Sequence, residues 1–415
     1  MSSANIDASR KIDNEFVRLF FFNVGHGAST LISMPPAKTG SERRYGVVDC
    51  KDLPGISFVE KYLLSPPFKD EPACEKPFVL EFVALTHFDT DHFTGMSRLL
   101  GGPGSPFTVR RFLGPPCYPI KVANTKYKPR GARYQELYAI HELAYEPTRR
   151  AVRLGKAPIL DIFLLNQRYD WFRDINIEIM GLAPVADAVI DEKTLARGGN
   201  PSSGALRLRF KTKHVQILGG DVEKEDWEEI QQRLNGNPQD LLKANSIGVP
   251  HHGGRGNPRE VWDRFSRRMQ KDVWMDKWKL RKPSEAVVSC GINDPFTRRE
   301  SYKIFLQTKC IISCTNPSKF CKELLARQNS KPPCISINDK KIVIDPLEKF
   351  RCAESITRDV EENLKPYAAP PQDVFDGCIS VTLREKRRPK VKYFNRKPCK
   401  LTLKKIKEYE SRKNS

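Results

Sequence analysis

The sequence lacks the long apolar runs that membrane proteins need. No run approaches the roughly 18 apolar residues of a membrane-spanning helix. Residues 1–14 are polar and charged, without the apolar segment of a secretory signal. The eleven cysteines are an odd number in a chain without such a signal, so reduced thiols are expected rather than a disulfide framework. These absences together predict a soluble cytoplasmic protein with no membrane partner.

Acidic residues are also in short supply. The chain has 50 Asp and Glu residues against 71 Lys and Arg residues, a formal net charge of +21. The excess is concentrated in residues 384–415, with fourteen basic and three acidic residues, and in a second basic stretch at residues 264–282. Basic segments attract phosphate backbones because binding releases condensed counterions. The charge therefore favours nucleic acid as a partner; a solubilising tail and a protein-binding surface are the alternatives.

The chain is long enough, and apolar enough, for one large α/β domain. It has 415 residues, of which 39% are hydrophobic. Helices are expected at residues 133–154, 222–234 and 260–269, and a closing hairpin at 335–344. Strands are expected at residues 18–24, 45–49, 78–85, 107–112, 159–165, 175–182, 205–210, 214–218, 245–249 and 286–290. Because both halves carry strands and helices, the pattern favours a layered α/β/β/α sandwich.

A change of composition after Pro346 suggests a domain boundary. The sequence becomes rich in proline and then in lysine. We expect a polar leader over residues 1–15, a single domain over residues 16–346, and a Pro-containing linker with a basic tail over residues 347–415.

Histidine is scarce, yet its distribution is uneven. Five of the seven histidines lie in three glycine-punctuated turns that follow apolar strands: His26, His87, His92, His251 and His252. Strand ends let a rigid sheet aim side chains at a common point. Four of the six residues from His87 to His92 are His or Asp, and burying them together without a cation would be costly. The pattern therefore predicts a metal site.

The residue types narrow the choice of metal. Imidazole and carboxylate ligands without cysteine suit Zn²⁺ or Mn²⁺ and argue against a structural zinc site. Asp221 and His251 each follow a strand and a glycine or proline, so we expect them to complete the ligand set.

Residues 86–92 resemble the second motif of the metallo-β-lactamase superfamily, in the His-x-Asp-x-Asp-His form that is typical of ComEC-type proteins. Further segments resemble that subgroup in the same order, so the match is collinear over about residues 16–344: residues 22–27, 47–49, 203–208, 219–221 and 248–253. The resemblance implies a metallo-β-lactamase-like four-layer αββα sandwich, here with a basic C-terminal extension. It also implies a nuclease activity.

The resemblance further implies a ligand assignment. His87 and Asp89 would hold one metal; Asp91, His92 and His251 would hold the second, and Asp221 would bridge the two. The histidine that usually completes the first site is missing, since the aligned stretch is residues 200–203. One or two ions are therefore expected.

Other roles follow from the same motifs. Asp49 would orient the ligand loop, and we assign Asp49, Asp91 and His252 to catalysis. His26, Arg298 and Arg299 are assigned to substrate binding, because paired arginine donors suit a phosphate. Ala28, Gly254 and the two arginines depart from the subgroup pattern, which leaves substrate choice open.

A bound divalent cation brings the pKa of water toward about 7 and can hold a phosphoryl oxygen. With the basic segments, this predicts a metal-dependent hydrolase, and specifically a nuclease or phosphodiesterase. Hydrolysis of a small phosphoester or another ester is one alternative, and a non-catalytic binding module of the same fold is another. Late cysteines at 310, 314, 321 and 334 are compatible with free thiols or with a zinc clip.

Overall fold

The structure is a computed structural model of the full chain. The residues that it describes are 15–38, 41–53, 56–102, 104–115, 132–145, 157–184, 203–211, 214–233, 241, 244–253, 285–289, 311–315, 375, 378–384 and 390–394.

The first sheet has eight strands in the order β17-β16-β1-β2-β3-β5-β7-β8. Strands β1 to β3 form an antiparallel meander, and β3, β5, β7 and β8 run parallel to one another. The bounds are β1 Phe16–Phe21, β2 Ser29–Met34, β3 Arg44–Cys50, β5 Phe82–Ala84, β7 Arg111–Gly114, β8 Ile159–Ile162, β16 Ile379–Arg384 and β17 Lys390–Tyr393.

The second sheet has seven strands in the order β15-β14-β13-β12-β11-β10-β9. Strands β9 to β12 are antiparallel, and β12 to β15 are parallel. The bounds are β9 Arg168–Phe172, β10 Ile177–Ala183, β11 Ala205–Phe210, β12 His214–Leu218, β13 Ser246–Gly248, β14 Glu285–Val288 and β15 Ile311–Cys314.

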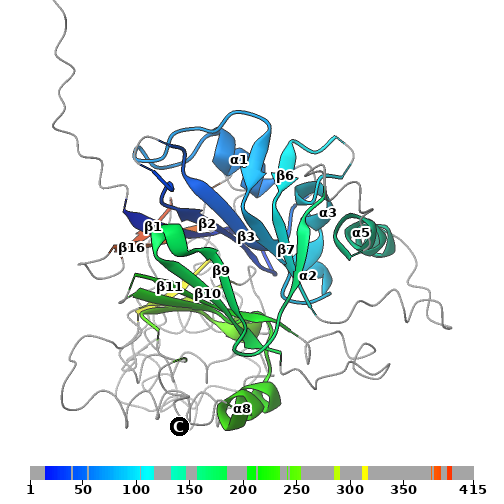
Figure 1. Ribbon diagram of the computed structural model, residues 1–415, viewed down its shortest axis with the longest axis vertical. Helices are drawn as coiled ribbons and strands as arrows, with labels where there is room; N and C mark the ends of the chain where they lie inside the picture. The colour runs from blue at the N-terminus through cyan, green and yellow to red at the C-terminus, as the bar shows by residue number, and fades with distance from the viewer. Residues whose placement is uncertain are drawn as a thin grey trace, which may run out of the picture.

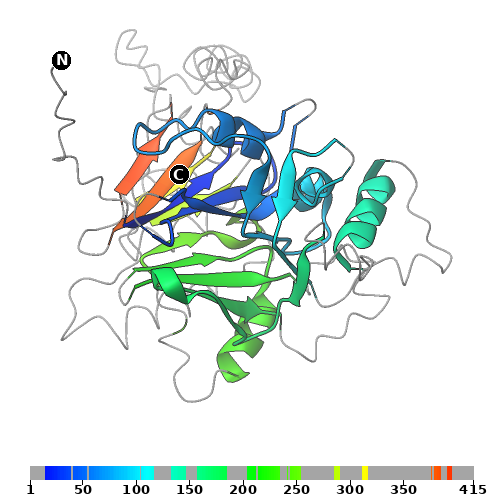
Figure 2. The same ribbon diagram turned by 45° about the horizontal axis from the view of Figure 1, so that its top comes forward.

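The two sheets face each other, and the helices lie outside them (Figures 1 and 2). Helices α1 Phe58–Leu64, α2 Thr90–Phe93, α3 Met96–Leu99 and α5 Ala132–Ile140 cover the first sheet, and α8 Lys224–Arg233 packs on the second. The core between the sheets uses alternate strand residues: Leu206, Leu208 and Phe210 point inward, while Arg207 and Arg209 point outward. The predicted four-layer αββα sandwich is confirmed.

Two expected strands are broken where the chain changes sheet. Residues 78–85 form β4 Phe78–Leu80 and β5, and residues 107–112 form β6 Phe107–Val109 and the start of β7. Strands β4 and β6 pair in a separate two-stranded sheet. Continuous apolar sequence does not reveal such a break, because strands that face different neighbours have the same periodicity.

The long helix expected at residues 133–154 is shorter in the part that the structure describes. Helix α5 ends at Ile140, and a π-helical turn follows over His141–Tyr145. The helix expected at 260–269 and the hairpin expected at 335–344 lie outside the described residues.

The C-terminal part of the chain contributes to the first sheet, contrary to the tail expected after Pro346. Strand β16 pairs with β1 over six residues, from Phe16↔Arg384 to Phe21↔Ile379, and its Ile379, Val381 and Leu383 enter the core between the sheets. The composition of residues 347–415 hides this strand, because proline and lysine on either side of it dominate the local pattern. Among the described residues, none of the helices combines the length and apolar character needed to cross a membrane.

Candidate metal centre

The histidines and aspartates singled out in the sequence meet at one end of the sandwich. In the first sheet, Asp49 is the last residue but one of β3, and His87 follows shortly after β5. In the second sheet, Asp221 and His252 follow shortly after β12 and β13. Strands β3 and β5 run parallel to each other, as do β12 and β13, so the carboxyl ends of each pair lie side by side. The fold therefore brings residues about 200 positions apart in the chain into one cluster.

The first group of side chains is buried. His87, His92 and Asp221 are 0%, 1% and 4% exposed. The Nε2 atom of His92 lies 3.3 Å from Asp221 Oδ1, and the Nε2 atom of His87 lies 3.7 Å from Asp221 Oδ2. Three ligand-type atoms thus converge from two different sheets.

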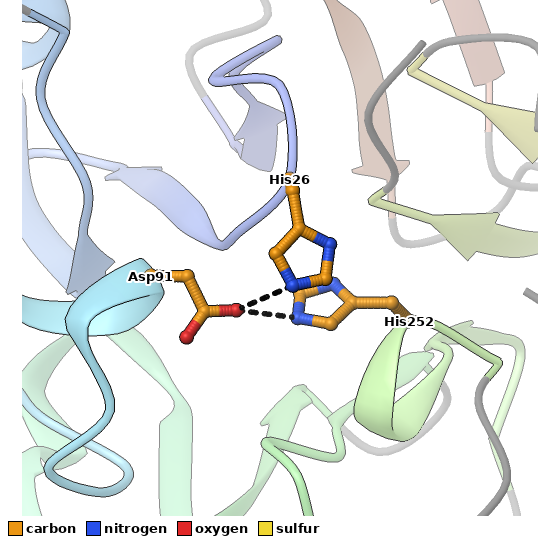
Figure 3. Close-up of side chains that lie close together, drawn as sticks. All are labelled: His26, Asp91 and His252. Carbon is orange, nitrogen blue, oxygen red and sulfur yellow. Dashed lines mark ion pairs between the residues drawn. The ribbon is translucent and has the colours of Figure 1, made fainter. Parts of the chain in front are cut away.

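The second group lies beside the first and is more open. The Oδ2 atom of Asp91 is 3.1 Å from His26 Nε2 and 3.3 Å from His252 Nε2, so both rings point at one carboxylate oxygen (Figure 3). His26 comes from the turn between β1 and β2, Asp91 from α2, and His252 from the turn after β13. The two groups are in contact, since Asp91 Oδ2 also lies 3.8 Å from His92 Nε2.

Asp49 orients the first group through hydrogen bonds to Thr86 and His92. Its carboxylate accepts hydrogen bonds from the backbone N–H of Thr86 at 2.8 Å and from the Thr86 hydroxyl at 2.9 Å. It also lies 2.8 Å from His92 Nδ1, which must be the donor because a carboxylate only accepts. This bond fixes the ring so that Nε2 faces Asp221.

Similar contacts orient the other imidazoles. The carbonyl oxygen of Ser289 accepts a hydrogen bond from His252 Nδ1 at 2.8 Å, which leaves Nε2 facing Asp91. His87 Nδ1 lies 3.1 Å from the hydroxyl of Thr86. The hydroxyl of Ser203 accepts a hydrogen bond from the Asp221 backbone N–H at 2.8 Å.

The charges in the cluster are strongly coupled. Burial, reinforced by the neighbouring His92, lowers the pKa of His87 to about 4, so the His87 imidazole is neutral at physiological pH. Against the effect of its own burial, the pKa of Asp221 is held well below its usual range by the charges of His92 and His252. Burial also opposes the rise in the pKa of His92, which Asp221 and Asp49 nevertheless produce.

The donor set fits a small divalent cation. Ligand atoms 2.0–2.1 Å from a tetrahedral zinc ion lie about 3.3–3.5 Å apart; the separations are 3.3 and 3.7 Å in the first group and 3.1 and 3.3 Å in the second. The Nε2 atom of His87 is buried without a hydrogen-bond partner among the described residues. Buried polar atoms normally have a partner, and a bound cation would supply one here. A cavity of about 50 Å³ adjoins Asp49, His92, Asp221 and His252.

Most of the predicted ligands lie in the two groups, but not all of them do. His87, Asp91, His92 and Asp221 lie in the two groups, as does His26, which was expected to bind substrate. Asp89 lies at the edge, with Oδ2 3.7 Å from His87 Nε2.

His252, rather than His251, faces Asp91. The Nε2 atom of His251 lies 4.0 Å from Asp221 Oδ2, and its Nδ1 atom lies 3.7 Å from Glu223 Oε1. Both histidines have positive φ angles, 49° and 50°. This left-handed turn decides which of two adjacent histidines points into the cluster, and sequence alone does not specify it.

Three contacts of the cluster were not expected from the sequence: Thr86, Ser289 and Lys51. Thr86 and Ser289 hold ligand rings, and Lys51 Nζ donates a hydrogen bond to the carbonyl oxygen of His26. Lys51 and Ser289 directly follow β3 and β14, and Thr86 lies two residues after the end of β5; this position after a strand is the signal in the sequence that points to them. Arg298, Arg299 and the basic stretch 264–282 lie outside the described residues.

Comparison with known proteins gives distant structural matches only. No protein-family model and no curated protein matches the sequence. The metallo-β-lactamase fold protein YhfI from Bacillus subtilis is 12% identical, with a TM-score of 0.36, over 72% of this chain and 96% of that chain.

Two further solved structures match at a similar level. The isothiocyanate hydrolase from Delia radicum gut bacteria is 12% identical, with a TM-score of 0.34, over 71% of this chain and 95% of that one. Zn²⁺-bound PqqB from Methylobacterium extorquens is 10% identical, with a TM-score of 0.32, over 56% and 72%.

Proposed function

We propose that this chain is a metal-dependent hydrolase of the metallo-β-lactamase superfamily, of the ComEC-type subgroup, and that it cleaves phosphodiester bonds in nucleic acid with Zn²⁺ or Mn²⁺. The observation that carries the proposal is the convergence of two ligand groups, His87–His92–Asp221 and His26–Asp91–His252, at the ends of both sheets. A non-catalytic core would gain nothing from burying so many ionisable groups together.

The chain's own residues prepare the centre for a divalent cation. Asp49 and the Ser289 carbonyl fix the rings of His92 and His252 with Nε2 directed inward. The aspartates Asp91 and Asp221 supply negative charge to a site with little exposure to solvent. When bound, the cation supplies an activated water and holds a phosphoryl oxygen.

A substrate would approach from the side of His26. The His26 side chain is 39% exposed and that of Asp91 17%, whereas the side chains of His87 and His92 are 0% and 1% exposed. The second group therefore lies on the solvent-accessible side of the centre, and the first group lies on its buried side.

The preference for nucleic acid rests on charge. The net charge is +21, and the proposed contacts to phosphates are Arg298, Arg299, the stretch 264–282 and the basic tail. Within the described residues of the tail, Lys392 instead lies over the rings of Phe68 and Phe394, at 4.8 Å and 4.5 Å from their centroids. We assign Lys392 to packing of the first sheet rather than to nucleic acid.

The test is a cleavage assay with purified protein. Single- and double-stranded DNA, RNA and a small phosphodiester are each incubated with Zn²⁺, with Mn²⁺ and with chelator. We expect cleavage of at least one nucleic acid, its loss with chelator, and a fall of at least about 10³-fold in Asp221→Asn. Arg173→Ala, at an exposed position on the second sheet's side, is the matched control and should retain full activity.

The other outcomes decide between the alternatives. Activity on the small phosphodiester alone would exclude the nuclease proposal and leave a small-ester hydrolase. Binding of nucleic acid without cleavage under any metal condition would leave a non-catalytic binding module.

A further inference from the structure

We infer that His26, in the turn between β1 and β2, is a direct ligand of a second cation, together with Asp91 and His252. The inference rests on the proposed metal-dependent function. It assigns the residues of the centre to two separate ion positions. It changes the role expected for His26, which was substrate binding, and it adds a ligand from outside the motif at residues 87–92.

The turn that carries His26 is fastened to the centre by its backbone. The backbone N–H of Ala28 donates to the carbonyl oxygen of Asp91 at 2.9 Å. Lys51 Nζ donates to the carbonyl oxygen of His26, and the Ser289 hydroxyl donates to that of Gly27. These three contacts connect the turn to α2, to the end of β3 and to the end of β14.

The close approach of the turn to α2 requires glycine. Gly27 has a φ angle of 133°, and a Cβ atom at this position would overlap the backbone oxygen of Asp91. Gly25 has a φ angle of 73°, so both neighbours of His26 adopt conformations that glycine favours. The position of the His26 ring is therefore set by a fitted backbone and not by a freely moving loop.

Three ligand-type atoms converge at this position. His252 donates from Nδ1 to the Ser289 carbonyl, which fixes the ring with Nε2 toward Asp91. His252 Nε2 lies 3.3 Å from Asp91 Oδ2, and His26 Nε2 approaches the same oxygen at 3.1 Å. Two imidazoles and one carboxylate that meet in this way are a ligand set that suits Zn²⁺ or Mn²⁺.

The rings of His26 and His252 converge on one side of Asp91, with their ligand atoms within 4.8 Å of one another. The ring centroids of His26 and His252 are 4.8 Å apart, and the planes are inclined by 47° (Figure 3). The rings are therefore not stacked face to face, and both Nε2 atoms are directed at one side of Asp91. With His87, His92 and Asp221 forming the other position, the structure assigns three protein ligands to each ion.

The test measures bound metal rather than turnover. Wild-type protein and four variants, His26→Ala, His26→Gln, His26→Asp and His141→Ala, are titrated with Zn²⁺, and the dialysed proteins are analysed for zinc. Gln can still hydrogen-bond Asp91 but is a poor zinc ligand, whereas Asp supplies a carboxylate. His141 lies in the π-helical turn outside the cluster and is the matched control. Circular dichroism and retention of the first ion report folding.

We expect two zinc ions per chain in the wild type and in His141→Ala. His26→Ala and His26→Gln should hold one, or bind the second at least about tenfold more weakly, since losing even an outer partner of a ligand costs about 10–100-fold. His26→Asp should recover part of the loss. With Co²⁺, the visible absorption of His26→Ala should differ from that of the wild type, because a nitrogen ligand is lost.

Other outcomes separate this inference from the proposed function. Equal affinity for two ions in the wild type, His26→Ala and His26→Gln would overturn the inference alone, as would a wild type that binds one ion. Loss of the second ion in His26→Ala without any hydrolysis by the wild type would overturn the proposed function and leave the ligand assignment standing. A wild type that binds no divalent cation would overturn both.

Discussion

At the scale of single residues, Asp49 shows how a carboxylate that lies under the ligands controls them. It is 3% exposed and contacts both the Thr86 backbone and the His92 ring. Its own backbone has a φ angle of 54°, a left-handed conformation that Asp and Asn tolerate better than other non-glycine residues. Asn is therefore the replacement that changes the charge with the least strain.

We expect Asp49→Asn to weaken zinc binding by about 10–100-fold, because the neutral amide orients His92 Nδ1–H less strongly. The free energy of unfolding should change by no more than about 2 kcal/mol. Zinc titration and urea unfolding measure the two effects. Asp161→Asn, at a partly exposed pair with Arg111, should leave zinc affinity as it is; an unchanged affinity in Asp49→Asn would contradict the orienting role.

Asp52 is a second carboxylate whose environment affects stability rather than the centre. Burial raises its pKa to about 6, against the hydrogen bonds from Phe58 and Ser57. A carboxyl group with a raised pKa in the folded state destabilises the fold where it is ionised. This penalty is absent below pH 4 and grows as the pH rises through 6.

The variant Asp52→Asn should therefore unfold at higher urea than the wild type at pH 7.5, with a gain of about 1–2 kcal/mol, and should show no gain at pH 4. Urea unfolding at both pH values measures the difference. Asp170→Asn, an exposed partner of Arg173, should show no such pH dependence. A gain of equal size at both pH values would mean that ionisation of Asp52 is not the cause.

At the scale of elements, β16 matters most for understanding how the chain is divided. It pairs with β1 along its whole length, and its Leu383 is fully buried. The buried Arg18 of β1 reaches Thr382 of β16 at 3.2 Å and forms ion pairs with Asp70 and Glu71. The strand is thus tied to the first sheet by backbone, apolar and polar contacts.

We expect Leu383→Ala to lower the free energy of unfolding by about 2–4 kcal/mol, as for other fully buried leucines. Lys390→Ala, at an exposed position of β17, should change it by less than about 0.5 kcal/mol. Urea unfolding monitored by circular dichroism measures both. If Leu383→Ala were as stable as Lys390→Ala, the strand would not be part of the core.

At the scale of the whole molecule, the candidate centre joins the two sheets. Asp91 and His92 belong to the layer of the first sheet, and Asp221 and His252 follow strands of the second. A cation held by both sides binds the folded chain in preference to the unfolded one, and so stabilises the sandwich by mass action.

Chelation should therefore lower the thermal midpoint of the wild type by several degrees. Free Zn²⁺ at about 100 times its Kd adds about 2.7 kcal/mol to the free energy of unfolding. Differential scanning calorimetry with chelator and with added Zn²⁺ measures the shift. Asp221→Asn is the comparison, because its midpoint should respond much less. A wild-type midpoint that is indifferent to both additions would argue against a cation between the sheets.

The sequence by itself determined the main ligand-type residues and several of the strands. The spacing of His87, Asp89, Asp91 and His92 in one turn after an apolar strand predicted a metal site, because ligand chemistry within a few residues is local. The alternation of apolar and basic residues in 205–210 predicted β11 for the same reason: the period of a strand is visible in the residues themselves.

The tertiary structure decided what depends on distant parts of the chain. It paired β16 with β1, brought His26 against Asp91, and turned His252 rather than His251 toward the cluster. Strand pairing and the contacts of a turn are set by backbone geometry and by packing between segments far apart in sequence. The sequence therefore identifies the ligand-type residues, whereas the fold determines how they are grouped around two proposed ion positions.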